Sequence, residues 1–226
     1  MFGIDYAKVE PLFINMNSLG LVGISGKEGS GKHNFIKYLI GTLDEVYKDK
    51  TEVHIIDSIN RKLAECEKMD NVNSYTILSE LGKQAVLKIE HELEQRYTEI
   101  ANGNIDVLSE SKLLVLIINS IEVLDEMCTD NNTLSSLRNI VGKYKSMNVC
   151  TLIGNYENKS IPYAANEFVK KIKEDKHIVF FDNLASLKIF DVPLTVSRNF
   201  KKPLSIGDCY YMKDTECHKI KSILNE

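Results

Sequence analysis

The chain has 226 residues, 43% of them hydrophobic and 27% charged, which is enough to form a sizeable globular core. Its net charge of -4 argues against a surface that binds nucleic acid on its own. The five cysteines include no C-x-x-C pair, which argues against a disulfide framework or a zinc knuckle and is typical of reduced thiols in the cytoplasm. The sequence opens with no signal peptide and has no run of about 18 apolar residues, so we expect any membrane anchor to lie outside it.

The N-terminal part predicts two short strands, over 10–15 and 19–25, followed by a glycine-rich loop. Beyond the loop, apolar residues recur at the spacing of an amphipathic helix, at Phe35, Ile36, Leu39, Ile40, Leu43 and Val46. This order of strand, loop and helix is the context in which a phosphate-binding loop occurs.

The middle of the chain predicts a buried strand over 52–58, a short helix over 60–66 and a long helix with Ser79 as its N-cap. The long helix has an apolar stripe at i, i+4 spacing, formed by Leu81, Ala85, Ile89, Leu93 and Tyr97. The clearest strand is the continuous apolar run in KLLVLIIN (112–119), which indicates burial on both faces, as in the centre of a parallel sheet.

The rest of the chain continues this alternation of strands and helices. It predicts a helix around Leu137, a strand over 148–155, a helix that starts near Pro162, and strands over 177–182, 188–196 and 207–212, the last two as a hairpin. The alternation indicates an α/β fold with a mostly parallel sheet flanked by helices. Neither a repeat nor a long linker interrupts it, so we expect a single domain over 1–226.

The glycine-rich loop matches most of the phosphate-binding pattern G-x-x-x-x-G-K-[ST], but His33 stands where the pattern requires Ser or Thr. In such loops, backbone N–H groups and a helix N-terminus bind phosphate, the lysine contacts the outer phosphates, and the hydroxyl holds Mg²⁺. Imidazole is a poor ligand for Mg²⁺, so we expect ATP to bind, if it does, without this metal. The candidate phosphate-binding residues are Gly26, Lys27, Glu28, Gly29, Ser30, Gly31, Lys32 and His33.

The second half of such a site is an apolar strand that ends in Asp-Glu, where Asp holds the metal and Glu activates water. Here the strand ends in Asn119 and Ser120, which lack the charge for the first role and the basicity for the second. Glu122 and Asp125 follow on the predicted first turns of a helix and are poorly placed to replace them. Together with His33, these changes predict a module with no metal site and no efficient ATP hydrolysis.

Two features remain open from the residues alone. Asp57 either faces the site or forms a turn or N-cap, and we favour the turn. An arginine finger that reaches a neighbouring subunit is the second open feature, and its candidates are Arg61, Arg96, Arg138 and Arg198.

Several segments, taken in order and over nearly the whole chain, resemble FtsK/SpoIIIE-type ATPases. They are VEPLFINM, GKEGSGKHN, ELEQRYTEIANGN, KLLVLIINSIEVL, SLRNIVGKYKSMNVCTLIGN and KPLSIGDCYYM. Within that family, the opening GIDYAKVEP is similar to the start of a module in the coupling proteins of type VII secretion, EssC in Firmicutes and EccC in actinobacteria. The chain resembles their C-terminal, third ATPase module, and this resemblance implies a RecA-like P-loop NTPase fold. His33, Asn119, Ser120 and GNYEN (154–158) depart from the family's catalytic pattern.

This resemblance implies partners and a location. The partners would be small helical secreted proteins of the WXG100 type and the preceding ATPase modules of the same protein, at the cytoplasmic side of the membrane. A homo-oligomer is compatible with it, and no direct contact with nucleic acid is expected. Tyr156 and Tyr163 follow a predicted strand and are candidates for binding the secreted substrate, unless they pack internally.

The sequence leaves more than one function open. The first is a catalytically degenerate ATPase module that recruits secreted substrates or regulates its neighbours. The second is an active ATP-driven motor that translocates protein or DNA. The intact glycines and Lys32 agree with both, whereas the changes at His33, Asn119 and Ser120 favour the first. A structural module whose loop binds nothing also agrees with the sequence.

Overall fold

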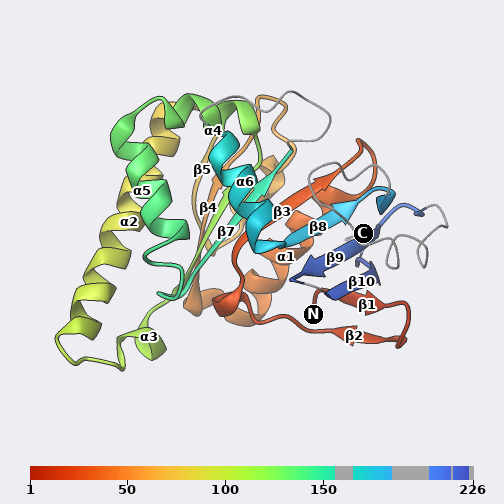
Figure 1. The fold of residues 1–226 in the computed structure, drawn as a ribbon, viewed down its shortest axis with the longest axis horizontal. Coiled ribbons are helices and arrows are strands. Elements are labelled where there is room, and N and C mark those ends of the chain that lie inside the picture. Colours follow the sequence, from red (N-terminus) through yellow and green to blue (C-terminus); the bar gives the residue numbers. More distant parts are fainter. Residues whose placement is uncertain (156–164, 185–203, 215, 224–226) are drawn as a thin grey trace.

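The computed structural model of the chain describes residues 1–155, 165–184, 204–214 and 216–223 (Figure 1). Ten strands within these residues form one sheet, in the order β2-β1-β10-β9-β8-β3-β7-β6-β4-β5. The strands are β1 (Gly3–Asp5), β2 (Glu10–Leu12), β3 (Gly20–Gly26), β4 (Thr51–Ile56), β5 (Val72–Thr76), β6 (Leu113–Ile118), β7 (Val149–Gly154), β8 (Ile178–Phe181), β9 (Asp208–Lys213) and β10 (Glu216–Lys221).

The sheet has a parallel part and an antiparallel part. The strands from β8 to β5 run parallel to one another, with β3 between β7 and β8. The strands β9, β10, β1 and β2 extend the sheet beyond β8 as antiparallel neighbours. The predicted α/β fold with a mostly parallel sheet is therefore confirmed.

Helices cover both faces of the sheet (Figure 1). One hydrophobic cluster lies between the sheet and α2, α4, α5 and α6, and the other lies between the sheet and α1. The helices are α1 (Lys32–Tyr47), α2 (Ser79–Ala101), α3 (Val107–Glu110), α4 (Ile121–Cys128), α5 (Asn131–Val141) and α6 (Asn166–Asp175).

The strand β6 shows why its sequence is apolar without alternation. All six of its residues are buried. Successive side chains of a strand point to opposite faces, and here Leu114, Leu116 and Ile118 belong to one cluster whereas Leu113, Val115 and Ile117 belong to the other. Both faces of the central strand therefore pack against helices, as predicted.

Several local predictions differ from the structure. The segment 60–66 is not an α-helix, because only a 3₁₀ turn forms, at Ala64–Lys68. Ser79 is the first residue of α2 rather than its N-cap, which is Leu78 without a side-chain hydrogen bond. The hairpin partner of β9 is β10, and the segment 188–196 that was predicted for that role lies outside the described residues.

The strands β1, β5 and β10 were not predicted from the sequence. Pro162, predicted near the start of a helix, lies outside the described residues, while the helix itself is α6. Within the described part of the chain, no helix is both long and apolar enough to cross a membrane.

Candidate functional site

The phosphate loop begins at Gly26, the last residue of β3, at the carboxyl edge of the parallel strands. Gly26 has a φ of 144°, and a Cβ at this position would lie 2.5 Å from the Cβ of Phe181 on β8. Gly29 and Gly31 also have positive φ, of 75° and 103°. Glycine is the residue that adopts such angles without strain, which explains the glycine pattern of the loop.

The loop ends at the N-terminus of α1. This terminus has no side-chain cap and no acidic residue in its first turn, so its N–H groups are available to an anion. Lys32 is 5% exposed, and its Nζ donates a hydrogen bond of 2.7 Å to the carbonyl oxygen of Gly26. The predicted phosphate-binding residues are therefore brought together in one turn, with Lys32 folded back over the loop.

The phosphate loop is also contacted by residues that lie near Gly207, far along the chain. The N–H of Gly207, just before β9, donates to the carbonyl oxygen of Ser30 at 3.1 Å. Gly207 also packs so closely that a Cβ on Gly31 would lie 3.2 Å from its nitrogen. The N–H and hydroxyl of Ser222 both donate to the carbonyl oxygen of Gly207, at 2.8 Å each. The sequence analysis did not find this contact.

At the neighbouring strand ends, Asp57 follows β4 and Asn119 follows β6. Asp57 accepts hydrogen bonds from the N–H groups of Ser58 and Leu63, which confirms its role in a turn. It also accepts from the side-chain amide of Asn119 at 2.8 Å and from the hydroxyl of Tyr75 at 3.0 Å. Both open interpretations of Asp57 are thus partly correct, because the turn aspartate also contacts the candidate site.

The residues after Asn119 have structural contacts. Ser120 is the N-cap of α4, where its Oγ accepts from the N–H of Val123 and donates to Glu122. Asp125 accepts from the N–H of Ala165 at 3.0 Å. The carboxylates that follow the strand therefore lie on α4, as predicted, and each has a hydrogen-bond partner away from the loop.

His33 lies on the first turn of α1, beside Lys32. Burial, together with the charges of Lys32, Lys62 and Lys37, lowers the pKa of His33 to about 4, and the charge of Asp57 opposes this shift. A neutral imidazole and the neutral amide of Asn119 are a poor set for Mg²⁺, which takes hard, usually charged oxygen ligands. These residues do not fit the metal that the fold family implies.

Three of the four arginines that were candidates for an arginine finger have contacts within the described residues. Arg96 is 4% exposed and donates to the carbonyl oxygens of Met147 and Asn148. Arg138 forms two hydrogen bonds with Glu167, at 2.7 and 2.8 Å. Arg61 lies over the ring of Tyr75, and Arg198 is outside the described residues. Among the described residues, no group of three His, Cys, Asp or Glu side chains could hold a metal ion.

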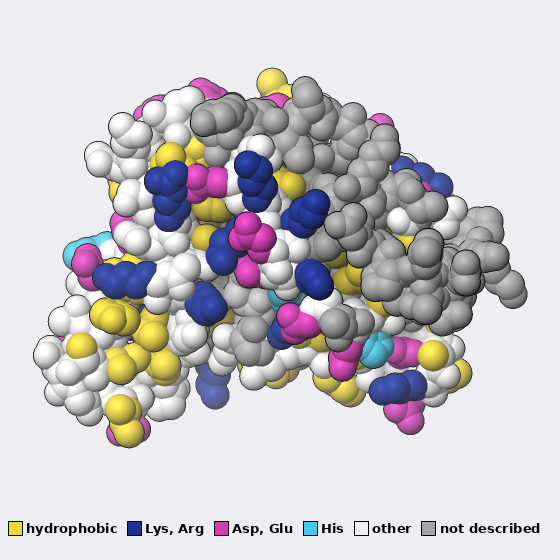
Figure 2. Space-filling view, in the orientation of Figure 1, with side chains coloured by type: hydrophobic (Ala, Val, Ile, Leu, Met, Phe, Trp, Pro, Cys, Tyr) yellow, Lys and Arg dark blue, Asp and Glu magenta, His cyan; other side chains and the backbone are white. Residues whose placement is uncertain are grey.

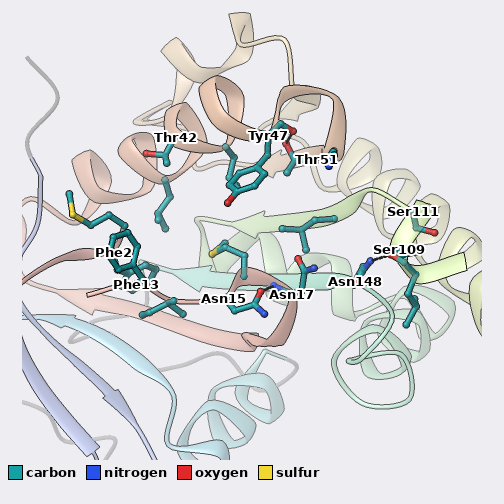
Figure 3. A pocket seen from close by; sticks show the side chains of 18 residues that line it. Phe2, Phe13, Asn15, Asn17, Thr42, Tyr47, Thr51, Ser109, Ser111 and Asn148 are labelled. Carbon is teal, nitrogen blue, oxygen red and sulfur yellow. Dashed lines mark hydrogen bonds between the residues drawn. The ribbon is translucent and has the colours of Figure 1, made fainter. Parts of the chain in front are cut away.

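A separate cavity of about 710 Å³ lies at the amino ends of the parallel strands, opposite the loop. It is lined by residues near the start of the chain, by α1, and by the first residues of β4 and β6. Figure 3 shows Phe2 and Phe13 at one end, Ser109, Ser111 and Asn148 at the other, and Tyr47 between them. We call this cavity the amino-edge groove, and the sequence analysis did not find it.

The amino-edge groove is apolar with a rim of neutral polar groups. Phe13 and Tyr47 are 73% and 50% exposed, which is unusual for large apolar side chains. Asn15 and Asn17 add amide groups, and Lys50 is the one charged side chain among the described lining residues. Such a surface suits a partner with apolar side chains and exposed peptide groups.

Charges are mixed on the face shown in Figure 2. Lys and Arg side chains lie between Asp and Glu side chains over the centre of this face, where α6 is located in Figure 1. Nucleic acid binding by charge generally requires a continuous basic surface. The described residues on this face do not form one.

Comparison with known proteins gives structural matches only, since no protein-family model and no curated protein match the chain. EssC (ATPases 2 and 3) from Geobacillus thermodenitrificans matches with a TM-score of 0.78 at 22% identity, over 100% of this chain and 41% of that chain. Thermomonospora curvata EccC (ATPases 2 and 3), in complex with a signal sequence peptide, matches with a TM-score of 0.70 at 16% identity, over 100% and 40%.

A third match contains a nucleotide. It is the genome packaging NTPase B204 from Sulfolobus turreted icosahedral virus 2 in complex with ATP-gammaS, with a TM-score of 0.57 at 13% identity, over 92% of this chain and 100% of that chain. The chain spans only 41% and 40% of the EssC and EccC chains, which contain two ATPase modules each. The chain has the fold of the ATPase modules of the type VII secretion proteins EssC and EccC.

Proposed function

We propose that residues 1–226 are one catalytically degenerate P-loop ATPase module of a type VII secretion coupling protein. In this role the module recruits secreted substrates or regulates neighbouring ATPase modules and does not hydrolyse ATP. The likeness of its fold to EssC and EccC supports its assignment to a type VII secretion protein. The cytoplasmic side of the membrane, the preceding modules as partners and a homo-oligomer are parts of the same proposal.

The observation that carries the proposal is the contact between Asn119 and Asp57. Asn119 occupies the strand end where the family has its metal-binding aspartate, and its amide donates to a carboxylate that is completely buried. His33 on α1 and Ser120 as the cap of α4 stand where the family has its metal-holding hydroxyl and its water-activating glutamate, which supports the loss of both roles. ATP remains a plausible ligand, because the loop and Lys32 are present.

The test of catalysis is phosphate release by the wild type and by Lys32→Ala, measured in saturating Mg²⁺. We expect equal rates. Since catalytic groups act as a unit, we expect none of the single changes His33→Thr, Asn119→Asp and Ser120→Glu to raise the rate. Steady release that requires Lys32 would contradict the proposal and favour an active motor.

Substrate recruitment is best supported by the amino-edge groove. Its exposed aromatic side chains and amide groups suit a helical or extended segment of a small secreted protein. The EccC structure in complex with a signal sequence peptide supports this class of partner. Tyr156 and Tyr163 lie outside the described residues and stay a second candidate surface.

The groove is tested by binding of small helical secreted proteins to the wild type and to the double variant Phe13→Ala with Tyr47→Ala. Both side chains are largely exposed, so we expect the fold to survive. Loss of two exposed aromatic contacts should weaken binding by about tenfold or more. Ile59→Ala, at a residue that is 82% exposed and away from the groove, is the matched control. Equal affinity of all three proteins would exclude the groove, and no binding by the wild type would contradict recruitment.

A further inference from the structure

Buried polar atoms without a hydrogen-bond partner lie in the phosphate loop and at neighbouring strand ends on the same edge of the sheet. Four of the five such atoms among the described residues are Ser30 Oγ, His33 Nε2, Ser58 Oγ and Asn119 Oδ1. A buried polar atom without a partner is destabilising, and native proteins normally pair it with protein, water or an ion. Their concentration at one edge of the sheet therefore indicates a site for a polar ligand.

These side chains are built into the fold. Ser30, Ser58 and Asn119 are 6%, 7% and 1% exposed. Asn119 Oδ1 faces the end of β7, because a Cβ on Gly154 would lie 3.1 Å from it. The other neighbour of β7 is β3, which leads into the loop. The unpartnered oxygen is therefore directed toward the loop side of β6, away from Asp57.

The charges around His33 favour an anion. Lys32 and Lys37 lie on its own helix, and Lys62 and Asp57 lie on the segment after β4 that packs against it. Lys37 is paired with Glu65 at 2.8 Å. The carboxylate of Asp57 is itself surrounded by four hydrogen-bond donors. The N-terminus of α1, which has no acidic residue in its first turn, adds positive potential.

We propose that the loop binds a phosphate group together with a proton instead of a magnesium ion, and that His33 carries the proton. This inference rests on the proposed function, in which the module has no magnesium site. The proton comes from solvent and adds to the imidazole of His33, so that Nε2–H donates to a phosphate oxygen. No bond to phosphorus forms or breaks. His33 then contributes the positive charge that Mg²⁺ supplies in active members of the fold.

The unliganded state of His33 agrees with this mechanism. Burial holds its pKa at about 4, so the imidazole is neutral at pH 7. A phosphate group beside it favours the charged form and raises the pKa of His33. Binding would therefore take up a proton, and affinity would increase as pH falls through the range between the unbound and bound pKa values.

The experiment is calorimetric titration with ATP, pyrophosphate and inorganic phosphate in EDTA, at pH 8 and pH 6. The proteins are the wild type, His33→Gln and Lys32→Ala. Gln places an amide N–H near the position of Nε2 but does not titrate. The ligand's own protonation is the same for wild type and His33→Gln, so the difference between them isolates His33. The three ligands show whether the site takes a nucleotide or any phosphate.

We expect the fall from pH 8 to pH 6 to strengthen wild-type binding about tenfold more than binding by His33→Gln, since uptake of one proton changes affinity by at most about tenfold per pH unit and acts over part of this interval. Binding heats measured in buffers of different ionisation enthalpy should show that the wild type takes up as much as one proton more than His33→Gln when the ligand binds. Lys32→Ala should bind weakly at both pH values, and replacing EDTA by Mg²⁺ should change wild-type affinity little.

Four outcomes would overturn the inference. An equal pH dependence in His33→Gln would remove His33 from the mechanism. Equal binding by Lys32→Ala, or no binding of any of the three ligands by the wild type, would show that the loop is not a phosphate site, and the recruitment role would still stand. Strong enhancement by Mg²⁺ would overturn the inference and also the proposed loss of the metal site.

Discussion

Asn119 and Asp57, at the ends of β6 and β4, are joined by a hydrogen bond of 2.8 Å in which the amide donates to the carboxylate. Asp57 is fully buried and needs donors around it. An aspartate at position 119 would instead place a second carboxylate against the first. The neutral residue at the strand end is therefore coupled to the turn that contains Asp57, so a substitution at position 119 also affects that turn.

This contact predicts a pH-dependent cost for Asn119→Asp. We expect the variant to lose about 3 kcal/mol of unfolding free energy at neutral pH, since a buried charge loses a donor and gains a like charge. The neighbouring charge raises the pKa of the introduced carboxyl above its unfolded value. The loss should therefore be small near pH 4 and grow as pH rises through the raised pKa.

Urea unfolding from pH 4 to pH 8 measures this effect. Asn119→Ala is the control, because it removes the donor without adding a charge, and its loss should depend much less on pH. Parallel pH curves for the two variants would contradict the explanation.

The second prediction concerns Gly26. A Cβ there meets Phe181 at 2.5 Å, in addition to the strain of a φ of 144°. Gly20 also has a positive φ, of 62°, but a Cβ there meets nothing within 4 Å. Gly26→Ala should lose at least about 3 kcal/mol of unfolding free energy and Gly20→Ala about 1 kcal/mol. Thermal or urea unfolding of the two variants measures these losses. The larger loss in Gly26→Ala would reflect the steric overlap with Phe181, whereas equal losses would mean that Phe181 moves aside.

The third prediction uses the buried His177, which contacts the hydroxyl of Tyr211 at 3.1 Å. Burial, with a smaller effect of Lys213, lowers the pKa of His177 to about 4. Because the unfolded state binds a proton near pH 6.5 and the folded state does not, stability should fall as pH decreases from 6.5 to 4. The contribution is about 3 kcal/mol. His177→Gln should lose less stability over the same interval, and an identical loss would contradict the prediction.

The fourth prediction separates two arginines. Arg96 is buried and donates to the carbonyl oxygens of Met147 and Asn148, just before β7. Arg138 pairs with Glu167 on the surface. Arg96→Ala should cost about 3 kcal/mol of unfolding free energy, because a buried side chain is removed and two half-buried carbonyl oxygens lose a charged donor, whereas Arg138→Ala should cost less than about 1 kcal/mol. Chemical denaturation measures both, and a small loss at Arg96 would reopen its role as a finger.

The sequence predicted the elements that repeat a strong pattern. The run Leu113–Ile118 and the glycine loop were found because double-sided burial and positive φ each restrict the choice of residue. The strands β1, β5 and β10 were missed. They are short or largely polar, as in VNSYT and ECHKIK, and their pairing with a neighbouring strand rather than their own apolar pattern defines them.

The candidate site was predictable only in part, for a similar reason. Asp57 and Asn119 could each be placed at a strand end, but the sequence does not state that β4 and β6 are neighbours. The hydrogen bond between them follows from that order. The contact of Gly207 with the loop had no local signature, because a single glycine before a strand occurs in many turns.

The contact between Gly207 and the loop has a consequence for how the chain folds. Ser30 lies early in the sequence, while Gly207 and the Ser222 that anchors it are synthesised much later. Contacts between such distant segments form late and slowly, because the intervening chain must be ordered before they contribute stability. The phosphate loop of a growing chain therefore lacks this contact until the β9–β10 hairpin docks, so a chain truncated before Gly207 is not expected to present a finished binding site.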